Sequence, residues 1–244
     1  MRFSVLAVAR IPDVATARRV LGLDDLSDKS VFKVVTHNRK QQTGTDERLR
    51  WDQQMIGGMT LIHCSADGVQ IDSMDLSTHS EEAMLQAFYK AALRTGRMVS
   101  WDGSAEVLPL LHFRSLIRHV SYPAYWQADR EGLNRFDDLA ATLMLDRQDR
   151  PTLDEVARKM GFPGLLKADP DKLIDAWLKQ RHHDLSAFTD MYALNCFLLA
   201  LSWFSMIGEH SRPDGERAKI KLRDELAKSD RDHRGEFLAI WGGS

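Results

Sequence analysis

Apolar positions recur with two spacings along the chain, and the spacing predicts where strands and helices lie. Strand-like runs cover residues 3–9, 55–64, 69–76 and 97–101, and the turn Ala66-Asp67-Gly68 predicts that the second and third form a hairpin. Helical spacing covers residues 14–21, 29–42, 80–93, 105–119, 152–160, 169–181, 184–208 and 214–227. We expect a loop over 122–132, and a segment over 134–145 that begins extended and becomes helical.

Polar residues mark several of the expected helix starts. The expected N-caps are Asp13, Ser80, Asp184 and Thr152, the last in a capping-box pattern with Glu155. The order of a strand, helices, a hairpin, a helix, a strand and further helices predicts a mixed sheet with helices on both faces. We expect a single domain over residues 1–244, in which residues 209–244 form a C-terminal helical extension.

Composition narrows the function classes only a little. The formal net charge is −2, which argues against a strongly basic nucleic-acid binder but leaves room for a local basic groove. The most apolar run, 193–207, contains three polar residues and falls short of the roughly 20 residues that a bilayer span needs. We therefore expect no membrane association. The cysteines Cys64 and Cys196 have no metal-type spacing and predict reduced thiols in a cytoplasmic protein.

Several segments together resemble one family, the predicted 3′–5′ exonucleases related to the exonuclease domain of B-family DNA polymerases, within the DEDD group. The similar segments are residues 6–13 to the family's FDIETVPD, 100–114 to SWNGxxFDLPxLxxR, 136–141 to HxDLMD and 187–199 to AYCETDVLNTYLL. Residues 21–28, 39–44, 153–164 and 175–178 continue the match. The resemblance implies an α/β, RNase H-like fold with a mixed five-stranded sheet flanked by helices.

The resemblance also implies a metal-dependent nuclease site, and this chain lacks its ligands. The family's phosphodiester hydrolysis uses two divalent cations, which carboxylates hold. The positions of the first two carboxylates, spaced i and i+2 on one strand face, are Ala7 and Ala9. The second-motif aspartate falls on Val107 and the third-motif aspartate on Tyr192, while Phe188 replaces the tyrosine that positions the attacking water. We expect these five side chains to converge into ordinary core, with no metal and no cofactor.

Other acids near these positions leave an alternative open. Asp102, Glu106, Asp137, Asp138 and Asp190 lie close to the motifs in sequence, so a rearranged site for magnesium or manganese is the alternative to solvated acids and helix caps. His182-His183-Asp184 has a metal-ligand composition, but adjacent residues on a helix do not face each other, and Asp184 also suits an N-cap.

One segment has the composition of a single-stranded nucleic-acid site. It contains Arg39, Lys40, Arg48, Arg50 and Trp51, which combine phosphate contacts with a stacking ring. Arg114 and Arg118 share a helix face and extend this patch, or are exposed polar positions. The acidic residues Asp46, Glu47 and Asp52 weaken the prediction, and ordinary surface charge is the alternative.

Three functions remain open at this point. The leading hypothesis is a catalytically inactive exonuclease-like protein that binds a protein partner, single-stranded DNA or RNA weakly, or both. The second is an active metal-dependent 3′–5′ exonuclease with rearranged carboxylate ligands. The third is a structural or regulatory subunit that makes no contact with nucleic acid.

Overall fold

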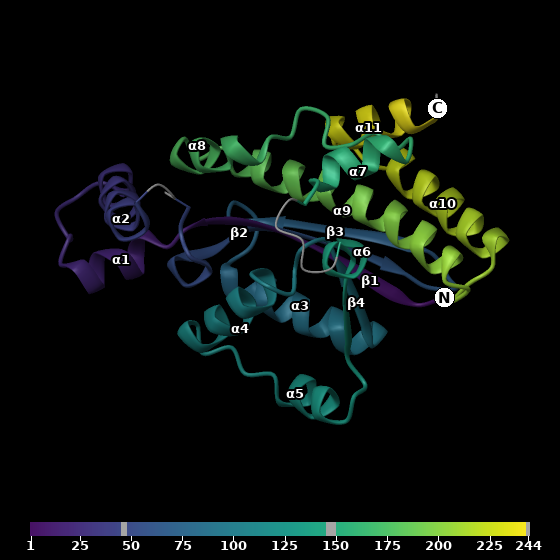
Figure 1. Ribbon diagram of the computed structural model, residues 1–244, viewed down its shortest axis with the longest axis horizontal. Coiled ribbons are helices and arrows are strands. Elements are labelled where there is room, and N and C mark those ends of the chain that lie inside the picture. Colours follow the sequence, from purple (N-terminus) through teal and green to yellow (C-terminus); the bar gives the residue numbers. More distant parts are fainter. Residues whose placement is uncertain (45–47, 145–149, 243–244) are drawn as a thin grey trace.

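A five-stranded mixed sheet forms the centre of the protein, in the order β3-β2-β1-β4-β5 (Figure 1). The computed structural model describes residues 1–44, 48–144 and 150–242. The strands are β1 (Phe3–Pro12), β2 (Gln54–Cys64), β3 (Val69–Asp75), β4 (Arg97–Ser100) and β5 (Arg135–Asp138). β1 pairs antiparallel with β2 and parallel with β4. The α/β fold that the resemblance implied is confirmed.

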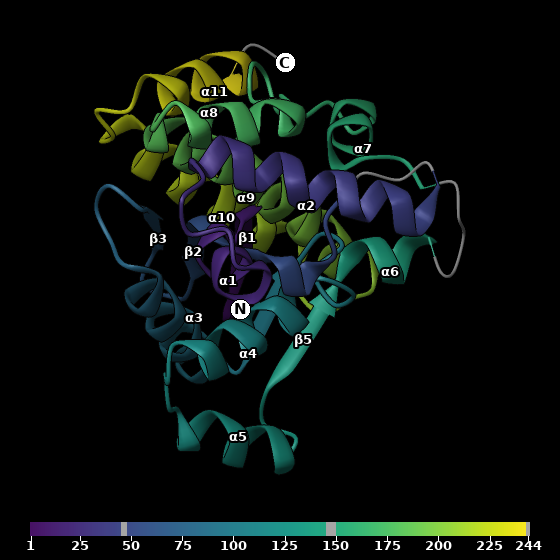
Figure 2. The same ribbon diagram turned by 90° about the vertical axis from the view of Figure 1, so that its left-hand side faces the viewer.

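Helices cover both faces of the sheet. They are α1 (Val14–Leu21), α2 (Asp28–Thr43), α3 (Glu81–Thr95), α4 (Val107–Ile117), α5 (Pro123–Arg130), α6 (Leu139–Met144), α7 (Leu153–Lys159), α8 (Leu173–Leu178), α9 (His182–Met206), α10 (Arg212–Ala227) and α11 (Asp232–Gly242), with 3₁₀ turns η1 (Trp51–Gln53) and η2 (Pro170–Lys172). The long helix α9 crosses one face and α3 crosses the other, while α1 and α2 lie beyond the end of β1 (Figures 1 and 2).

The alternation of β1 divides the core into two halves. Its odd-numbered residues, such as Val5 and Ala7, pack under α9, and Leu6 packs under α3. α9 carries apolar residues around most of its surface because it is largely buried, and buried polar residues such as Asp190 and Asn195 have hydrogen-bond partners. By length and composition it is the one helix within the described ranges that could span a membrane, but 83% of its most apolar stretch is buried in the protein. It is therefore the core helix of the fold.

Two glycines bring α9 close to the sheet. The register between β1 and β2 shifts after Ala9, because Ala9 pairs with Gly58 and Arg10 pairs with Ile56, which leaves Gly57 as a bulge. A Cβ atom at Gly57 would lie 2.8 Å from Ile11, and one at Gly58 would lie 3.3 Å from the backbone of Leu185 on α9. The helix therefore rests directly on this part of the sheet, with no room for a larger residue.

The structure corrects three local predictions. The expected loop over 122–132 contains α5, which begins with Pro123 at a position that suits proline and buries Tyr125 against Tyr89. The helix expected over 169–181 is a 3₁₀ turn followed by the short α8. Asp184 is not an N-cap, because α9 begins at His182 and Asp184 lies in its first turn, where it contacts His183 and Arg181.

The last helices add to the core under α9. α10 and α11 pack against each other and against α9 (Figure 1). Ser211 and Asp214 form a capping box at the start of α10. The buried residues that the two helices contribute are Ala218, Leu222, Leu226, Phe237 and Trp241. This C-terminal segment thus completes the hydrophobic core as well as extending the chain.

Candidate functional site

Two rows of residues cross the sheet beneath α9. Ala7 of β1 pairs with Thr60 of β2, which pairs with Ser73 of β3. The next row joins Ala9 and Gly58 to Asp75. Residues in register across neighbouring strands point to the same face. The side chains of both rows therefore face α9, and polar groups begin at Thr60 on β2 in the first row and at Asp75 on β3 in the second.

Apolar and aromatic side chains fill the space above Ala7 and Ala9. Both alanines are buried in the core that includes Phe188 of α9, and Tyr192 packs against the same core. The rings of Phe188 and Tyr192 lie 5.6 Å apart. Tyr192 Oη donates a hydrogen bond to the Trp101 carbonyl at 3.4 Å. Burial raises the pKa of the Tyr192 phenol, so the group stays neutral.

Val107 does not join this group. It stands at the first position of α4, is half-buried, and packs against the core on the opposite face of the sheet, under α3. Ala7, Ala9 and Phe188 thus belong to one apolar cluster against which Tyr192 packs, and the convergence of these four side chains stays a prediction; for Val107, which packs against the other cluster, the prediction is wrong. The residue of this turn that reaches β1 is Glu106, which forms an ion pair with Arg10. Sequence reasoning missed Arg10, and only the fold brings it to α4.

The remaining acids near β4 are each engaged by other groups. Asp138 accepts hydrogen bonds from the amides of Asp102, Ser104 and Ala141. Burial alone would raise the pKa of Asp138, but the donors from Ser104 and these amides outweigh it and lower the pKa. Asp102 is half-exposed and lies 3.4 Å from Arg150. Its pKa is raised, first by burial and then by the neighbouring Asp138.

Asp137 and the histidine pair also have other partners. Asp137 forms ion pairs with Arg97 and Arg135 at the end of the sheet. His183 Nδ1 lies 2.9 Å from Asp184 Oδ1 at the start of α9. Throughout residues 1–44, 48–144 and 150–242, no three His, Cys, Asp or Glu side chains gather closely enough to hold a metal ion. The described side chains therefore do not supply the clustered carboxylates that a pair of magnesium or manganese ions requires.

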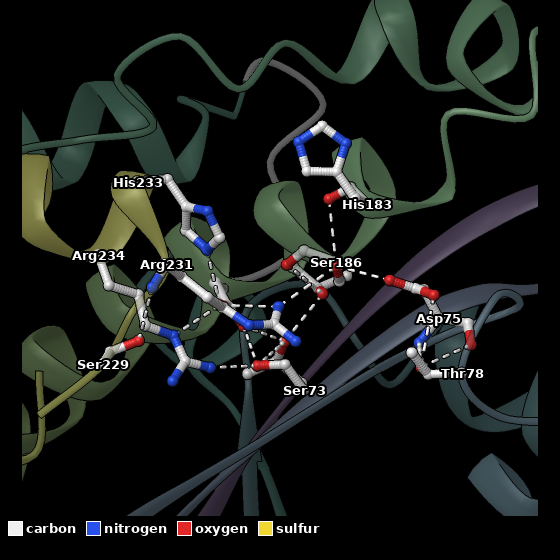
Figure 3. Close-up of polar contacts among 12 residues, drawn as sticks. Ser73, Asp75, Thr78, His183, Ser186, Ser229, Arg231, His233 and Arg234 are labelled. Carbon is white, nitrogen blue, oxygen red and sulfur yellow. Dashed lines mark hydrogen bonds and ion pairs between the residues drawn. The ribbon is translucent and has the colours of Figure 1, made fainter.

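Asp190 is the centre of a buried polar network, and Figure 3 labels its partners Ser73, His233 and Arg234. Its Oδ1 accepts hydrogen bonds from Thr60 Oγ1 at 2.7 Å and from Ser73. Its Oδ2 lies 2.8 Å from both His233 Nε2 and Arg234 Nε. Burial alone would raise the pKa of this carboxyl, but the bonds from His233 and Arg234 outweigh it and lower the pKa. Asp190 therefore fixes α11 to α9 and the sheet, and its lone pairs are directed at protein donors.

The predicted nucleic-acid residues are spread over α2 and η1. Arg39 Nε donates to the Arg48 carbonyl at 3.4 Å, which brings the end of α2 to η1. Arg50 makes two hydrogen bonds to Asp52, at 2.7 and 2.9 Å. Trp51 is half-buried and meets Phe113 edge to face, with ring centroids 5.6 Å apart. Lys40 is exposed, and Asp46 and Glu47 lie outside the described residues.

Arg114 was wrongly assigned to this surface. Only 1% of its side chain is exposed, and it forms ion pairs with Asp13 and with Glu81 at 2.7 Å. Arg118 also binds Glu81, at 2.7 Å. The ion pairs join α4 to the start of α1 and α3. A signal of this burial is visible in the sequence, because Leu110 shares the helix face of Arg114 by i, i+4 spacing.

The comparison with known protein families agrees with this geometry. Residues 49–241 match the family described as predicted 3′–5′ exonucleases related to the exonuclease domain of PolB. No curated protein matches the chain significantly. The match begins just after α2, so β1 with Ala7 and Ala9 precedes it. The assignment of these two alanines to the family's first two carboxylate positions is supported by the central position of β1 in the sheet. Because the match covers most of the chain, the protein belongs to this family of predicted 3′–5′ exonucleases related to the exonuclease domain of PolB.

Proposed function

We propose that this protein is a catalytically inactive member of its family that acts by binding other macromolecules in the cytoplasm, without a metal cofactor. One observation carries the proposal. At the motif positions where a metal pair would need carboxylates, Ala7, Ala9 and Phe188 are buried in an apolar cluster against which Tyr192 packs. Methyl groups and rings offer no ligand to magnesium or manganese. The two buried cysteines support a reducing location such as the cytoplasm.

The neighbouring acids support the same proposal. Glu106 pairs with Arg10, and Asp190 with Arg234 and His233. A cation at either carboxylate would have to displace a guanidinium that already neutralises it. Hydrolysis of a phosphodiester by two metal ions needs both an activated water and a stabilised leaving oxygen. The accessible acids described there, Asp102 and Glu106, lie beside Arg150 and Arg10 and are the ligands that the alternative of a rearranged site would need.

The binding activity that we propose includes a weak site for single-stranded DNA or RNA on α2 and η1. Exposed cations there can contact phosphates, but Trp51 is half-buried against Phe113 and Asp52 already neutralises Arg50. Stacking on one free aromatic face adds about 1–3 kcal/mol per base, so a ring that is only partly exposed adds less. We therefore expect electrostatic binding with little base preference.

Fluorescence anisotropy of a labelled oligothymidylate tests this site. Binding should weaken steeply as salt rises, because phosphate contacts release counterions. Arg48→Ala with Arg50→Ala should abolish most of the binding. The matched control is Arg130→Ala with Arg212→Ala, which removes two exposed charges from α5 and α10. Binding that survives the first pair, or that falls equally with the control pair, rejects the α2–η1 site.

A further inference from the structure

The outer edge of β3 borders a hollow of about 490 Å³. Four of the residues that line it, Ile71 to Met74, are consecutive. Neighbouring residues of a strand point to opposite faces, so a hollow that meets all four must follow the strand edge. β3 is also the last strand in the sheet order and pairs only with β2 in the described structure. The hollow therefore runs along an edge strand whose outer side pairs with no other strand in the described structure.

The two sides of this hollow differ in chemistry. Ser73 faces α9, and there the hollow is lined by Arg231 and Arg234 from the start of α11. Met74 faces α3, and there the lining includes Ala87. Asp72 shares the α3 side with Met74 and is bound to His63 Nε2 at 3.2 Å and to Gln70 at 2.8 Å. One side is thus cationic, and the other combines the apolar Met74 and Ala87 with Asp72, which already has partners; the lining also includes the exposed His79.

The cationic side carries more positive charge than its acid neutralises. Arg234 Nε lies 2.8 Å from Asp190 Oδ2, and Arg231 Nη1 lies 3.6 Å from the same oxygen. Arg231 also donates to Ser186 Oγ at 3.3 Å, and a third of its side chain remains exposed. Figure 3 shows the two guanidinium groups on the same side of the network, beside Ser73. Two guanidinium groups therefore share one carboxylate next to a free strand edge.

We propose that the β3 edge binds an extended segment of a partner protein whose side chains alternate between acidic and apolar. Such a segment would pair with β3 as an added strand, a known mode of peptide recognition. Its acidic side chains would contact the partly exposed guanidinium of Arg231, and its apolar side chains would face Met74 and Ala87. The positive charge on one side of β3 and the alternation of side chains along the strand together determine this choice of partner. This inference goes beyond the proposed inactivity and does not depend on it.

Four fluorescein-labelled heptapeptides test the proposal on the full-length protein. The first alternates valine and glutamate, and the second alternates valine and lysine. The other two have the sequence of the first and carry N-methyl groups on its odd-numbered or on its even-numbered residues; these are the two N-methyl phases. Fluorescence anisotropy should show binding of the first peptide and at least tenfold weaker binding of the second. One N-methyl phase should lose binding, because only one phase blocks the amides that face β3.

Substitution of Arg231 provides the matched protein test. Arg231→Gln should weaken binding of the glutamate peptide about fivefold, as expected for a partly exposed ion pair, while Arg130→Gln on α5 leaves it unchanged. Thermal melting checks that both variants are folded, and the N-methyl comparison on the unaltered protein stands even if Arg231→Gln melts early. Equal binding of the lysine peptide, equal binding of both N-methyl phases, or no peptide binding would each overturn the proposal. Inorganic phosphate binding without peptide binding would assign an anion site instead, and concentration-dependent dimerisation by sedimentation would assign a second copy of this chain.

Discussion

Replacing Asp190 with asparagine tests whether this residue stabilises the fold or serves as a metal ligand. The substitution keeps the shape of the side chain and removes its charge. Arg234 then remains with only 9% of its side chain exposed and without its carboxylate. Arg231 and His233 lose the same partner. The buried network would then contain the charged guanidinium of Arg234 with no carboxylate to balance it.

The expected loss of stability is large. Removing one partner of a buried ion pair costs about 3–5 kcal/mol, and the asparagine oxygen can keep one hydrogen bond, so we expect a loss near the lower figure, about 3 kcal/mol. For a chain of this size, each kilocalorie shifts the melting temperature by about 2–4 °C. Asp190→Asn should therefore melt about 6–12 °C below the unaltered protein.

The dependence on pH provides a second readout. The pKa of Asp190 is lowered in the folded protein relative to about 3.9 in an unfolded chain. Stability from such a group is fully present above the unfolded pKa and is lost as pH falls through the folded pKa. The unaltered protein should lose stability below about pH 4, and Asp190→Asn should lack this part of the loss.

Urea unfolding followed by circular dichroism measures both effects. Asp175→Asn is the matched control, because Asp175 forms exposed pairs with Lys179 and Arg181 and its loss should change the midpoint little. The reasoning is refuted if Asp190→Asn unfolds at the same urea concentration as the unaltered protein. It is also refuted if manganese stabilises the unaltered protein and not the variant, which would identify Asp190 as a metal ligand.

Three further results are expected. Ala9→Glu should destabilise the fold by at least about 3 kcal/mol in urea, because its carboxylate would be buried beneath α9, and normal stability would mean that a cavity exists there. Arg114→Ala should cost about 3–5 kcal/mol in urea while leaving oligothymidylate binding of the folded protein unchanged; lost binding without lost stability would restore Arg114 to the nucleic-acid surface. Burial raises the pKa of Cys64 to about 11 and raises that of Cys196 as well, so neither thiol should react with a disulfide reagent at pH 8 until urea unfolds the chain; fast reaction of either would contradict the described burial.

The regular elements were largely predictable because local sequence dictates them. Alternation around Ala66-Asp67-Gly68 located the β2–β3 hairpin, and Thr152 with Glu155 located the start of α7. The strand order required the family resemblance, because pairing between β1 and β4 joins residues that are far apart in the chain. Helix α5 was missed since its stability comes from packing of Tyr125 on α3, which no local pattern reveals.

The candidate site was predicted less completely. The motif positions indicated that Ala7, Ala9, Phe188 and Tyr192 would meet, and all four lie in or against the same apolar cluster. Val107 was misplaced because the motif spacing does not fix the direction of the first turn of α4.

The partners of the nearby acids could not be predicted at all. Arg10 reaches Glu106 across 96 positions, and Arg234 reaches Asp190 across 44. Such contacts follow from tertiary packing, which composition and periodicity do not determine. For the same reason no sequence pattern indicated the hollow at the β3 edge, where Arg231 and Arg234 meet a strand that is far from them in the chain.

Release of nucleotides from a 3′-labelled single-stranded oligonucleotide, in magnesium and then in manganese, tests the proposed inactivity most directly. Without ligands at positions 7, 9, 107 and 192 the metal pair should not form, so we predict no release above the buffer control. The companion variant is Asp102→Asn with Glu106→Gln, which removes two accessible acids of the site without altering its core. Metal-dependent release that this variant abolishes would contradict the account and establish an active exonuclease with rearranged ligands.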